Sequence, residues 1–170
     1  MDGTSYSFQF EKSIAAPRAL VWRAWTSPEE LKAWYRPDPS WSTPVAEIDL
    51  RRGGKYRIGL QPRVGPMFYE VGMYRDIKVP DLLVYTLRFL GTHLQFEGAH
   101  LDRPTGAEME KYETLITLAF EGPPQGTTRL LVNHGGYRTE EERDRHREGW
   151  PRFLESFAQH CVAAAQTSDE

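Results

Sequence analysis

The sequence predicts an α+β fold in which a curved antiparallel sheet of about six to seven strands wraps around one long C-terminal helix, with two short helices after the first strand. The first observation is the stretch 139–165, whose apolar residues recur at the spacing of one helix face. The second is the segment 44–132, where apolar and polar residues mostly alternate between turn sequences. Strand and helix patterns do not alternate there, which excludes a parallel sheet built from βαβ units.

The N-terminal part begins with a strand and continues with two short helices. In residues 8–14, apolar and polar side chains alternate, which indicates a strand with one apolar face. Pro17 then opens a helix over 18–25, at a position where a proline loses no hydrogen bond. Ser27 is expected to cap a second helix ending near residues 34–35, with Glu30 reaching back to the cap.

Residues 45–90 predict further strands joined by turns. Gly53-Gly54, the loop 61–66 and Val79-Pro80-Asp81 mark the turns. Two of these strands have a clear apolar face, formed by Tyr56, Ile58 and Leu60 and by Leu83, Tyr85, Leu87 and Phe89. The strand 68–79 instead carries large apolar residues on both sides, so we expect a bulge near Gly72.

An irregular segment and a hairpin follow. Residues 91–111 show no clear period, and loops of this length are usually functional or mobile. We expect this segment to shape the entrance of any pocket. Residues 112–121 and 127–134 then predict a closing hairpin. Its two strands direct the following side chains to one face each: Ile116, Leu118 and Phe120, and Thr128, Leu130, Val132 and His134.

The C-terminal helix begins with a capping box formed by Thr139 and Glu142 and would run roughly 40 Å. Its first part, up to Glu148, alternates in charge, which predicts a solvated face with ion pairs four residues apart. Its second part carries the apolar face. Pro151 lies between the two parts, so we expect a kink there.

Length and composition limit the function classes. The 170 residues predict a single domain, with its core at about 7–164 and flexible tails at 1–6 and 166–170. One cysteine excludes a disulfide framework and fits a cytoplasmic location. We expect neither a signal peptide nor a membrane-inserted span. The net charge of −3 argues against nucleic acid as a partner.

Five segments of the chain, in order, resemble one known group. They are residues 21–35, containing VWRAWTSPE; residues 49–54, DLRRGG; residues 72–86; residues 128–134; and Gly149-Trp150 with Leu154. Together they resemble the SRPBCC superfamily, and within it the group named for homology to the activator of the 90-kDa heat-shock chaperone ATPase. Departures are Arg52, where the group commonly has proline, the long segment 91–111, and Pro151.

The resemblance covers about residues 7–164. It implies a helix-grip fold, as in START and birch-pollen-allergen-like domains, with a cavity for apolar small molecules between sheet and helix. It implies no single catalytic motif, because relatives include chaperone-ATPase activators, polyketide cyclases and aromatases.

Aromatic residues are the main candidates for lining this cavity, since Tyr and Trp offer apolar area with one hydrogen-bonding edge. Plain core packing is an equally open interpretation for each of them. The predicted ligand-binding residues are Trp34, Trp41, Tyr56, Ile58, Tyr74, Tyr85, Leu118, Val132, His134, Trp150, Phe153, Leu154 and Phe157.

Two residues are candidates for acid–base chemistry. His134 shares a strand face with apolar residues, and Glu70 lies on an otherwise apolar strand. The more ordinary alternatives are a hydrogen-bonded structural histidine and, for Glu70 and Arg75, solvated side chains. Cys161 falls on the apolar helix face, where a thiol is usually inert. The histidines show no metal-ligand spacing, so we expect neither a metal nor another cofactor.

Three functions follow from these observations. The first is binding of an apolar or aromatic small molecule between the sheet and the C-terminal helix. The second is an enzyme of the cyclase, aromatase or hydrolase type that uses the same cavity. The third is an interaction module for a chaperone. A homodimer is left open.

Overall fold

The computed structural model describes residues 5–90 and 113–168. The predicted irregular segment 91–111 therefore lies outside the described residues. The helices and strands are β1 (Tyr6–Ile14), α1 (Arg18–Thr26), α2 (Pro28–Trp34), β2 (Ser42–Ile48), β3 (Lys55–Gln61), β4 (Phe68–Lys78), β5 (Leu82–Leu90), β6 (Thr114–Glu121), β7 (Thr128–Tyr137) and α4 (Glu140–Thr167).

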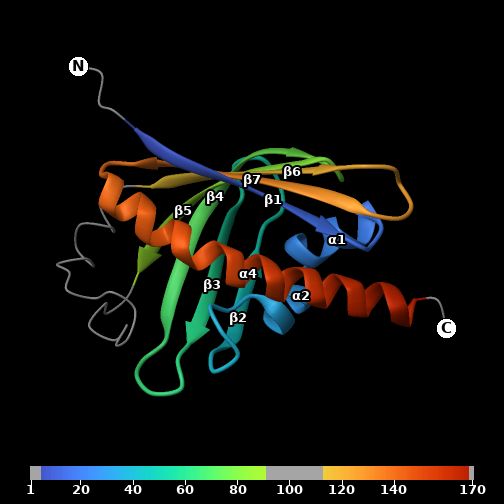
Figure 1. Ribbon diagram of the computed structural model, residues 1–170. Coiled ribbons are helices and arrows are strands. Elements are labelled where there is room, and N and C mark those ends of the chain that lie inside the picture. The colour runs from blue at the N-terminus through green and yellow to red at the C-terminus, as the bar shows by residue number, and fades with distance from the viewer. Residues whose placement is uncertain (1–4, 91–112, 169–170) are drawn as a thin grey trace.

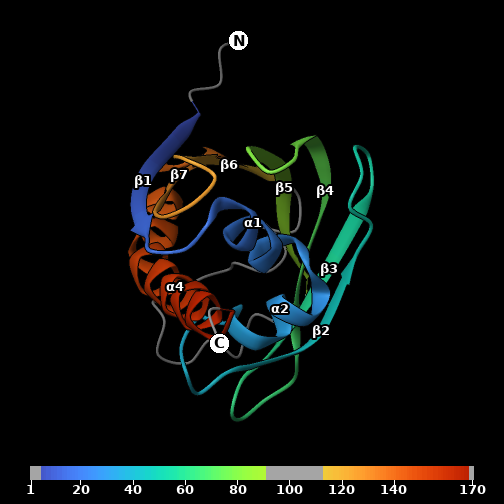
Figure 2. The same ribbon diagram turned by 90° about the vertical axis from the view of Figure 1, so that its right-hand side faces the viewer.

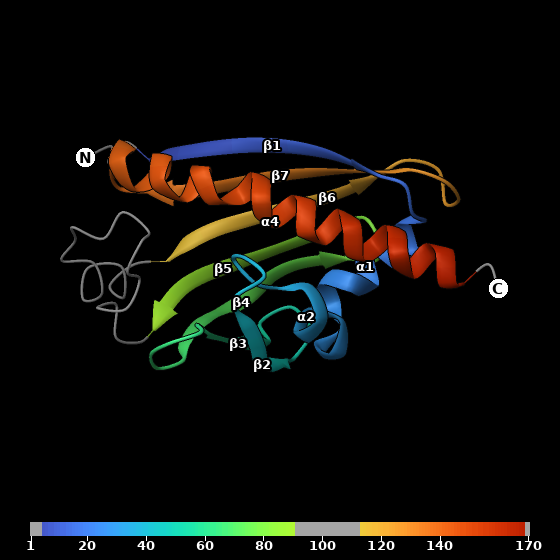
Figure 3. The same cartoon turned by 60° about the horizontal axis from the view of Figure 1, so that its bottom comes forward.

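The strands form one antiparallel sheet in the order β1-β7-β6-β5-β4-β3-β2. The sheet curves, and its concave side holds the long helix α4 together with α1 and α2 (Figures 1 and 2). Helix α4 crosses the sheet obliquely, with α1 and α2 near its C-terminal half (Figure 3). The predicted fold class is confirmed, and so are the strand number and the two short helices after β1.

The bulge in β4 lies elsewhere than predicted. The register between β4 and β5 shifts between Tyr74 and Asp76, so up to Tyr74 the strand alternates regularly. Gly72 serves a different purpose. A Cβ atom there would lie 2.8 Å from the Tyr56 ring and 1.9 Å from the Thr86 carbonyl oxygen. Glycine thus allows the Tyr56 side chain to pack directly on the β4 backbone.

The two predicted helix caps have different outcomes. Thr139 accepts a hydrogen bond from the Glu142 backbone N–H at 3.1 Å, as the capping box predicts. Ser27 stands at the N-cap position of α2, but its side chain makes no capping hydrogen bond. Glu30 does not turn back to the cap, because its carboxylate pairs with His160 of α4 at 2.5 Å. That pair ties α2 to α4.

Helix α4 runs unbroken through Pro151. The kink expected there stays a prediction. The first turns of α4, for which the sequence predicts a solvated face, are partly buried on the side that lies over the sheet. The Arg145 side chain is only 17% exposed, and it forms the predicted type of pair with Glu141 at 2.6 Å. His146 lies 2.9 Å from the Tyr137 hydroxyl, because these turns lie over the sheet.

No helix in the described part of the chain is long and apolar enough to cross a membrane. The same residues contain no group of three or more His, Cys, Asp or Glu side chains that could hold a metal ion.

Candidate functional site

Aromatic rings fill most of the space between α4 and the sheet. The Trp25 ring of α1 lies 4.8 Å from the rings of both Trp34 and Phe157, measured between centroids. Phe153 of α4 packs on Tyr35 at 4.6 Å. Trp34 is fixed further, because its indole N–H donates to the Ala24 carbonyl oxygen at 2.7 Å. This layer occupies the volume where the sequence predicts a ligand cavity.

The sheet side of this space is lined by tyrosines from neighbouring strands. Tyr56 of β3, Tyr74 of β4 and Tyr85 of β5 lie with ring centroids 5.5 to 6.2 Å apart. The Tyr56 hydroxyl donates to the Thr86 carbonyl oxygen at 2.6 Å. The Tyr85 hydroxyl accepts from the Trp25 indole at 3.2 Å.

Tyr74 differs from these two neighbours. Its side chain is only 4% exposed, yet its hydroxyl makes no hydrogen bond to any described residue. Tyr56 and Tyr85 each have a partner, so the free hydroxyl of Tyr74 is the available polar group of this cluster. Burial raises the pKa of Tyr74 above its ordinary value, so the hydroxyl remains a neutral donor and acceptor at physiological pH.

Glu70 lies in the same layer, so the alternative interpretation as a solvated side chain is wrong for this residue. It is 9% exposed, because Phe68, Glu70 and Tyr74 alternate inward along the regular part of β4. The Tyr35 hydroxyl donates to its carboxylate at 2.5 Å. Burial raises the pKa of Glu70 to about 7, and the hydrogen bond from Tyr35 opposes that rise. Near neutral pH this carboxyl therefore exists in both protonation states.

One small space of about 10 Å³ remains between these groups. That is room for about one water molecule and far below the volume of a ligand site. It is lined by Trp25, Leu31, Tyr35, Tyr56, Ile58, Tyr74, Leu83 and Tyr85. We call this space the interior gap.

His134 lies elsewhere in the core and is hydrogen-bonded there. It accepts from the Trp150 indole N–H at its Nδ1 atom, 3.1 Å away, and its Nε2 atom lies 2.8 Å from the Thr114 hydroxyl. The Tyr137 hydroxyl is 3.0 Å from the same ring. Burial holds the pKa of His134 well below its usual range, so the ring stays neutral. The hydrogen bonds expected of a structural histidine are present, and the candidate acid–base role of His134 stays a prediction.

The predicted cavity residues fall into separate groups. Tyr56, Ile58, Tyr74 and Tyr85 line the interior gap. The α4 residues Trp150, Phe153, Leu154 and Phe157 belong with Trp34 to the aromatic layer and the core. Leu118, Val132 and His134 are buried but do not line the gap. Trp41 packs against Phe68, with ring centroids 6.1 Å apart. A role in ligand binding stays a prediction for all of them.

Sequence reasoning missed two important residues of this site. Trp25 was assigned only to a short helix, and Tyr35 only to the end of another. Tyr35 is the C-cap residue of α2 in extended conformation, which turns its ring inward toward β4. The one available signal was the Trp34-Tyr35 pair, since two large aromatic residues at a helix end seldom face solvent together.

Cys161 is fully buried, and burial raises the pKa of its thiol to about 12. It is therefore an inert apolar residue at neutral pH, as the sequence predicted.

Most of the chain matches the model of one known protein family. Residues 15–161 match the family model described as "Activator of Hsp90 ATPase homolog 1-like protein". No curated protein matches the sequence of the chain.

Several solved structures share the fold. Protein SA2116 from Staphylococcus aureus, described as of unknown function, has a TM-score of 0.72 at 19% identity, covering 97% of this chain and 98% of that one. Protein NE0264 from Nitrosomonas europaea has a TM-score of 0.68 at 23% identity, covering 91% and 92%. A protein from Aeromonas hydrophila, described as AHSA1-like, has a TM-score of 0.68 at 17% identity, covering 94% of each chain.

Proposed function

Since the chain belongs to the family of Activator of Hsp90 ATPase homolog 1-like proteins, in the SRPBCC superfamily, we propose that it binds a small, mostly apolar molecule at the interior gap. The ligand has an aromatic or alicyclic body and at least one hydroxyl or carbonyl group. The observation that carries this proposal is the Tyr74 hydroxyl, which lines the gap without a hydrogen bond to any described residue.

The energetics of the core support this proposal. Phenylalanine at position 74 would fill the same nearly buried position without a polar group. The same layer also holds Glu70, a buried carboxyl whose desolvation opposes folding. Polar groups that weaken a core are expected where function requires them. A ligand hydroxyl or carbonyl within reach of Tyr74 would provide the missing partner.

Binding requires the interior gap to grow, because a small-molecule site typically encloses about 300 Å³ or more. Phe153 is only partly buried and packs on Tyr35 with their ring centroids 4.6 Å apart. We infer that rotation of these two rings opens the gap toward solvent between α2 and α4. Trp25 and Trp34 are held by indole hydrogen bonds and stay in place as the walls.

The test uses the neutral fluorophore N-phenylnaphthylamine and native mass spectrometry of the purified protein. We expect the fluorophore to bind and to be displaced by cyclic alcohols and ketones. Tyr74→Phe should weaken the alcohols about three- to tenfold, the effect of one neutral hydrogen bond, while leaving the matched hydrocarbons unchanged. If no probe binds and no bound species is detected, the proposal is wrong.

A second candidate is acid–base catalysis in the same place. It is favoured by one observation: Glu70 has a pKa of about 7 and a short hydrogen bond to the Tyr35 hydroxyl. Such a pair can exchange a proton with a bound carbonyl compound. The measurement is deuterium exchange at the α-carbon of a cyclic ketone, followed by NMR. Equal exchange rates with the wild-type protein and Glu70→Gln would exclude this candidate.

A further inference from the structure

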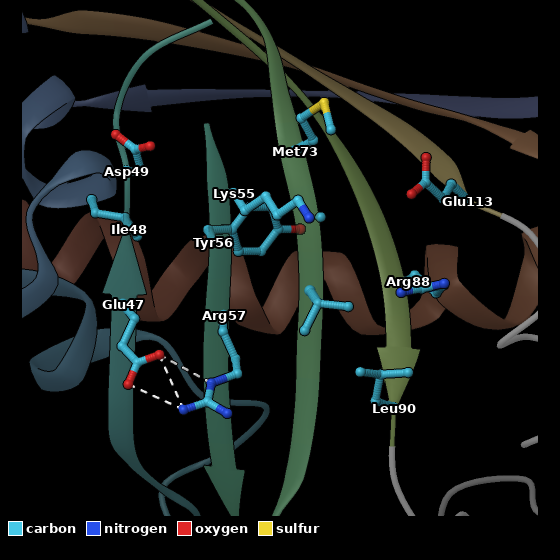
Figure 4. Close-up of a pocket in the computed structure, with 12 residues that line it drawn as sticks. Glu47, Ile48, Asp49, Lys55, Tyr56, Arg57, Met73, Arg88, Leu90 and Glu113 are labelled. Carbon is cyan, nitrogen blue, oxygen red and sulfur yellow. Dashed lines mark hydrogen bonds and ion pairs between the residues drawn. The ribbon is translucent and has the colours of Figure 1, made fainter. Parts of the chain in front are cut away.

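A second hollow lies over the opposite face of the sheet, and Tyr56 is the residue that its lining has in common with the interior gap. It is an open groove of about 640 Å³ over β2, β3, β4 and β5. Figure 4 shows the Glu47, Lys55, Arg57 and Met73 side chains on the near side of these strands, with α4 behind them. Half-buried apolar residues belong to its lining, namely Ile48, Val71, Met73 and Leu90. We call it the outer groove.

The acidic residues of the outer groove are each neutralised by an arginine. Glu47 pairs with Arg57 at 3.1 Å. In the same way, Asp49 pairs with Arg51 at 2.8 Å, and Glu113 pairs with Arg75 at 3.7 Å. The acidic residues therefore leave no net negative charge in the groove.

Two cationic side chains of the outer groove have no acidic partner among the described residues. Lys55 and Arg88 both line it, and neither forms an ion pair with any described residue. The Nε atom of Arg88 is in addition buried without a hydrogen-bond partner within the described part of the chain. A charged donor without a partner is expensive, and its presence in a folded protein calls for an explanation. An anion is the partner that would satisfy it.

The register of the strands brings these cations to one apolar surface. Val71 is the direct neighbour of Arg88 on β5, and Met73 is the direct neighbour of Lys55 on β3. From the strand spacing, the Lys55 and Arg88 backbones lie about 12 Å apart with β4 between them. Both side chains are long enough to meet a common group above that strand. Figure 4 shows the Lys55 side chain lying across β4.

We propose that the outer groove binds a small amphiphilic carboxylate. Arg88 and Lys55 hold its anionic head, and its apolar body lies along Val71, Met73 and Leu90. Arg88 takes the larger share, because a guanidinium can donate two parallel hydrogen bonds to a carboxylate. The ligand is a free molecule and not part of a membrane. This site is independent of the interior gap.

The test is isothermal titration calorimetry with decanoate at low and high salt. We expect decanoate to bind at low salt and more weakly at high salt, because added ions screen the exposed Lys55. Arg88→Gln and Lys55→Gln should each weaken binding about fivefold or more, as for a hydrogen bond to a charged group. Arg147→Gln is the matched control: Arg147 is exposed on α4 and unpaired among the described residues, and its loss should change the affinity less than twofold.

Several outcomes would overturn the proposal. One is decanoate binding that Lys55→Gln leaves unchanged, and this variant is informative even if Arg88→Gln fails to fold, because Lys55 is exposed. Equal affinities for decanoate and neutral decanol would be another. Binding to phosphatidylglycerol vesicles without binding to free decanoate would point to a membrane surface instead.

The two probes distinguish the two sites, because N-phenylnaphthylamine reports on the interior gap and decanoate reports on the outer groove. Arg88→Gln should leave N-phenylnaphthylamine binding unchanged, and Tyr74→Phe should leave decanoate binding unchanged. If decanoate binding is lost in Tyr74→Phe and kept in Lys55→Gln, the carboxylate occupies the interior gap and the outer groove is not a site.

Discussion

Replacing Glu70 by glutamine should stabilise the protein, and by more as the pH rises. The pKa of the carboxyl goes from its ordinary value of 4.5 to about 7 on folding. A carboxyl with a raised pKa binds its proton more tightly in the folded state, so protonation favours folding. No penalty exists below pH 4.5. The penalty grows as the pH rises and is complete once the pH exceeds about 7.

The size of this effect follows from the shift. The rise of the Glu70 pKa from 4.5 to about 7 corresponds to a free-energy penalty of about 3 kcal/mol between the acidic and the alkaline limit. At pH 5 the penalty is roughly 1 kcal/mol, and near pH 8.5 it is close to the full value. Glutamine stays neutral throughout and can still accept the Tyr35 hydrogen bond with its carbonyl oxygen.

The assay is urea unfolding followed by tryptophan fluorescence at pH 5 and pH 8.5. The free-energy difference between Glu70→Gln and the wild-type protein should rise by roughly 2 to 3 kcal/mol over this range. Glu29→Gln serves as the control, because the Glu29 side chain is 85% exposed. If the difference for Glu70→Gln does not depend on pH, the carboxyl is not held in its neutral form by burial.

Other predictions concern packing and reactivity. Gly149→Ala should stabilise α4 by up to about 1 kcal/mol in urea unfolding, since nothing lies within 4 Å of the new Cβ. Gly72→Ala should destabilise by about 3 kcal/mol or more, because its Cβ would lie 1.9 Å from a backbone oxygen, and a mild effect would contradict the close packing. Trp150→Phe should cost about 1–3 kcal/mol by removing the donor to His134, and wild-type stability would show that this bond is unimportant. Cys161 should resist iodoacetamide at pH 8 in the folded protein and react after unfolding, which mass spectrometry can follow.

The sequence was sufficient for the fold because its elements carry regular periods. The apolar face of α4 and the alternation in β3, β5 and β6 each follow from spacing alone. The bulge of β4 was misplaced, because Tyr69, Val71 and Met73 supply apolar residues to the outer face and so hide the inward alternation. For the same reason the burial of Glu70 could not be predicted.

The polar contacts of the site depend on partners from distant parts of the chain. Tyr35 meets Glu70 across 35 residues, and Trp25 meets Tyr85 across 60. Local pattern contains no information about such pairs. The same applies to the outer groove, because its charge depends on which arginines form ion pairs with acidic side chains. Glu47 and Arg57 face each other across β2 and β3, and Arg88 has no acidic partner among the described residues.

The pairing of the first strand with the last has a consequence for synthesis of the protein. Within the described part of the chain, strand β1 pairs with β7 alone, with Phe8 opposite His134, and β7 begins at Thr128. A chain emerging from the ribosome must therefore expose an unpaired strand until β7 has been made. Contacts of such long sequence separation slow folding, and unpaired strands invite association with other chains. During synthesis β1 can therefore associate with other chains until β7 has been made and pairs with it.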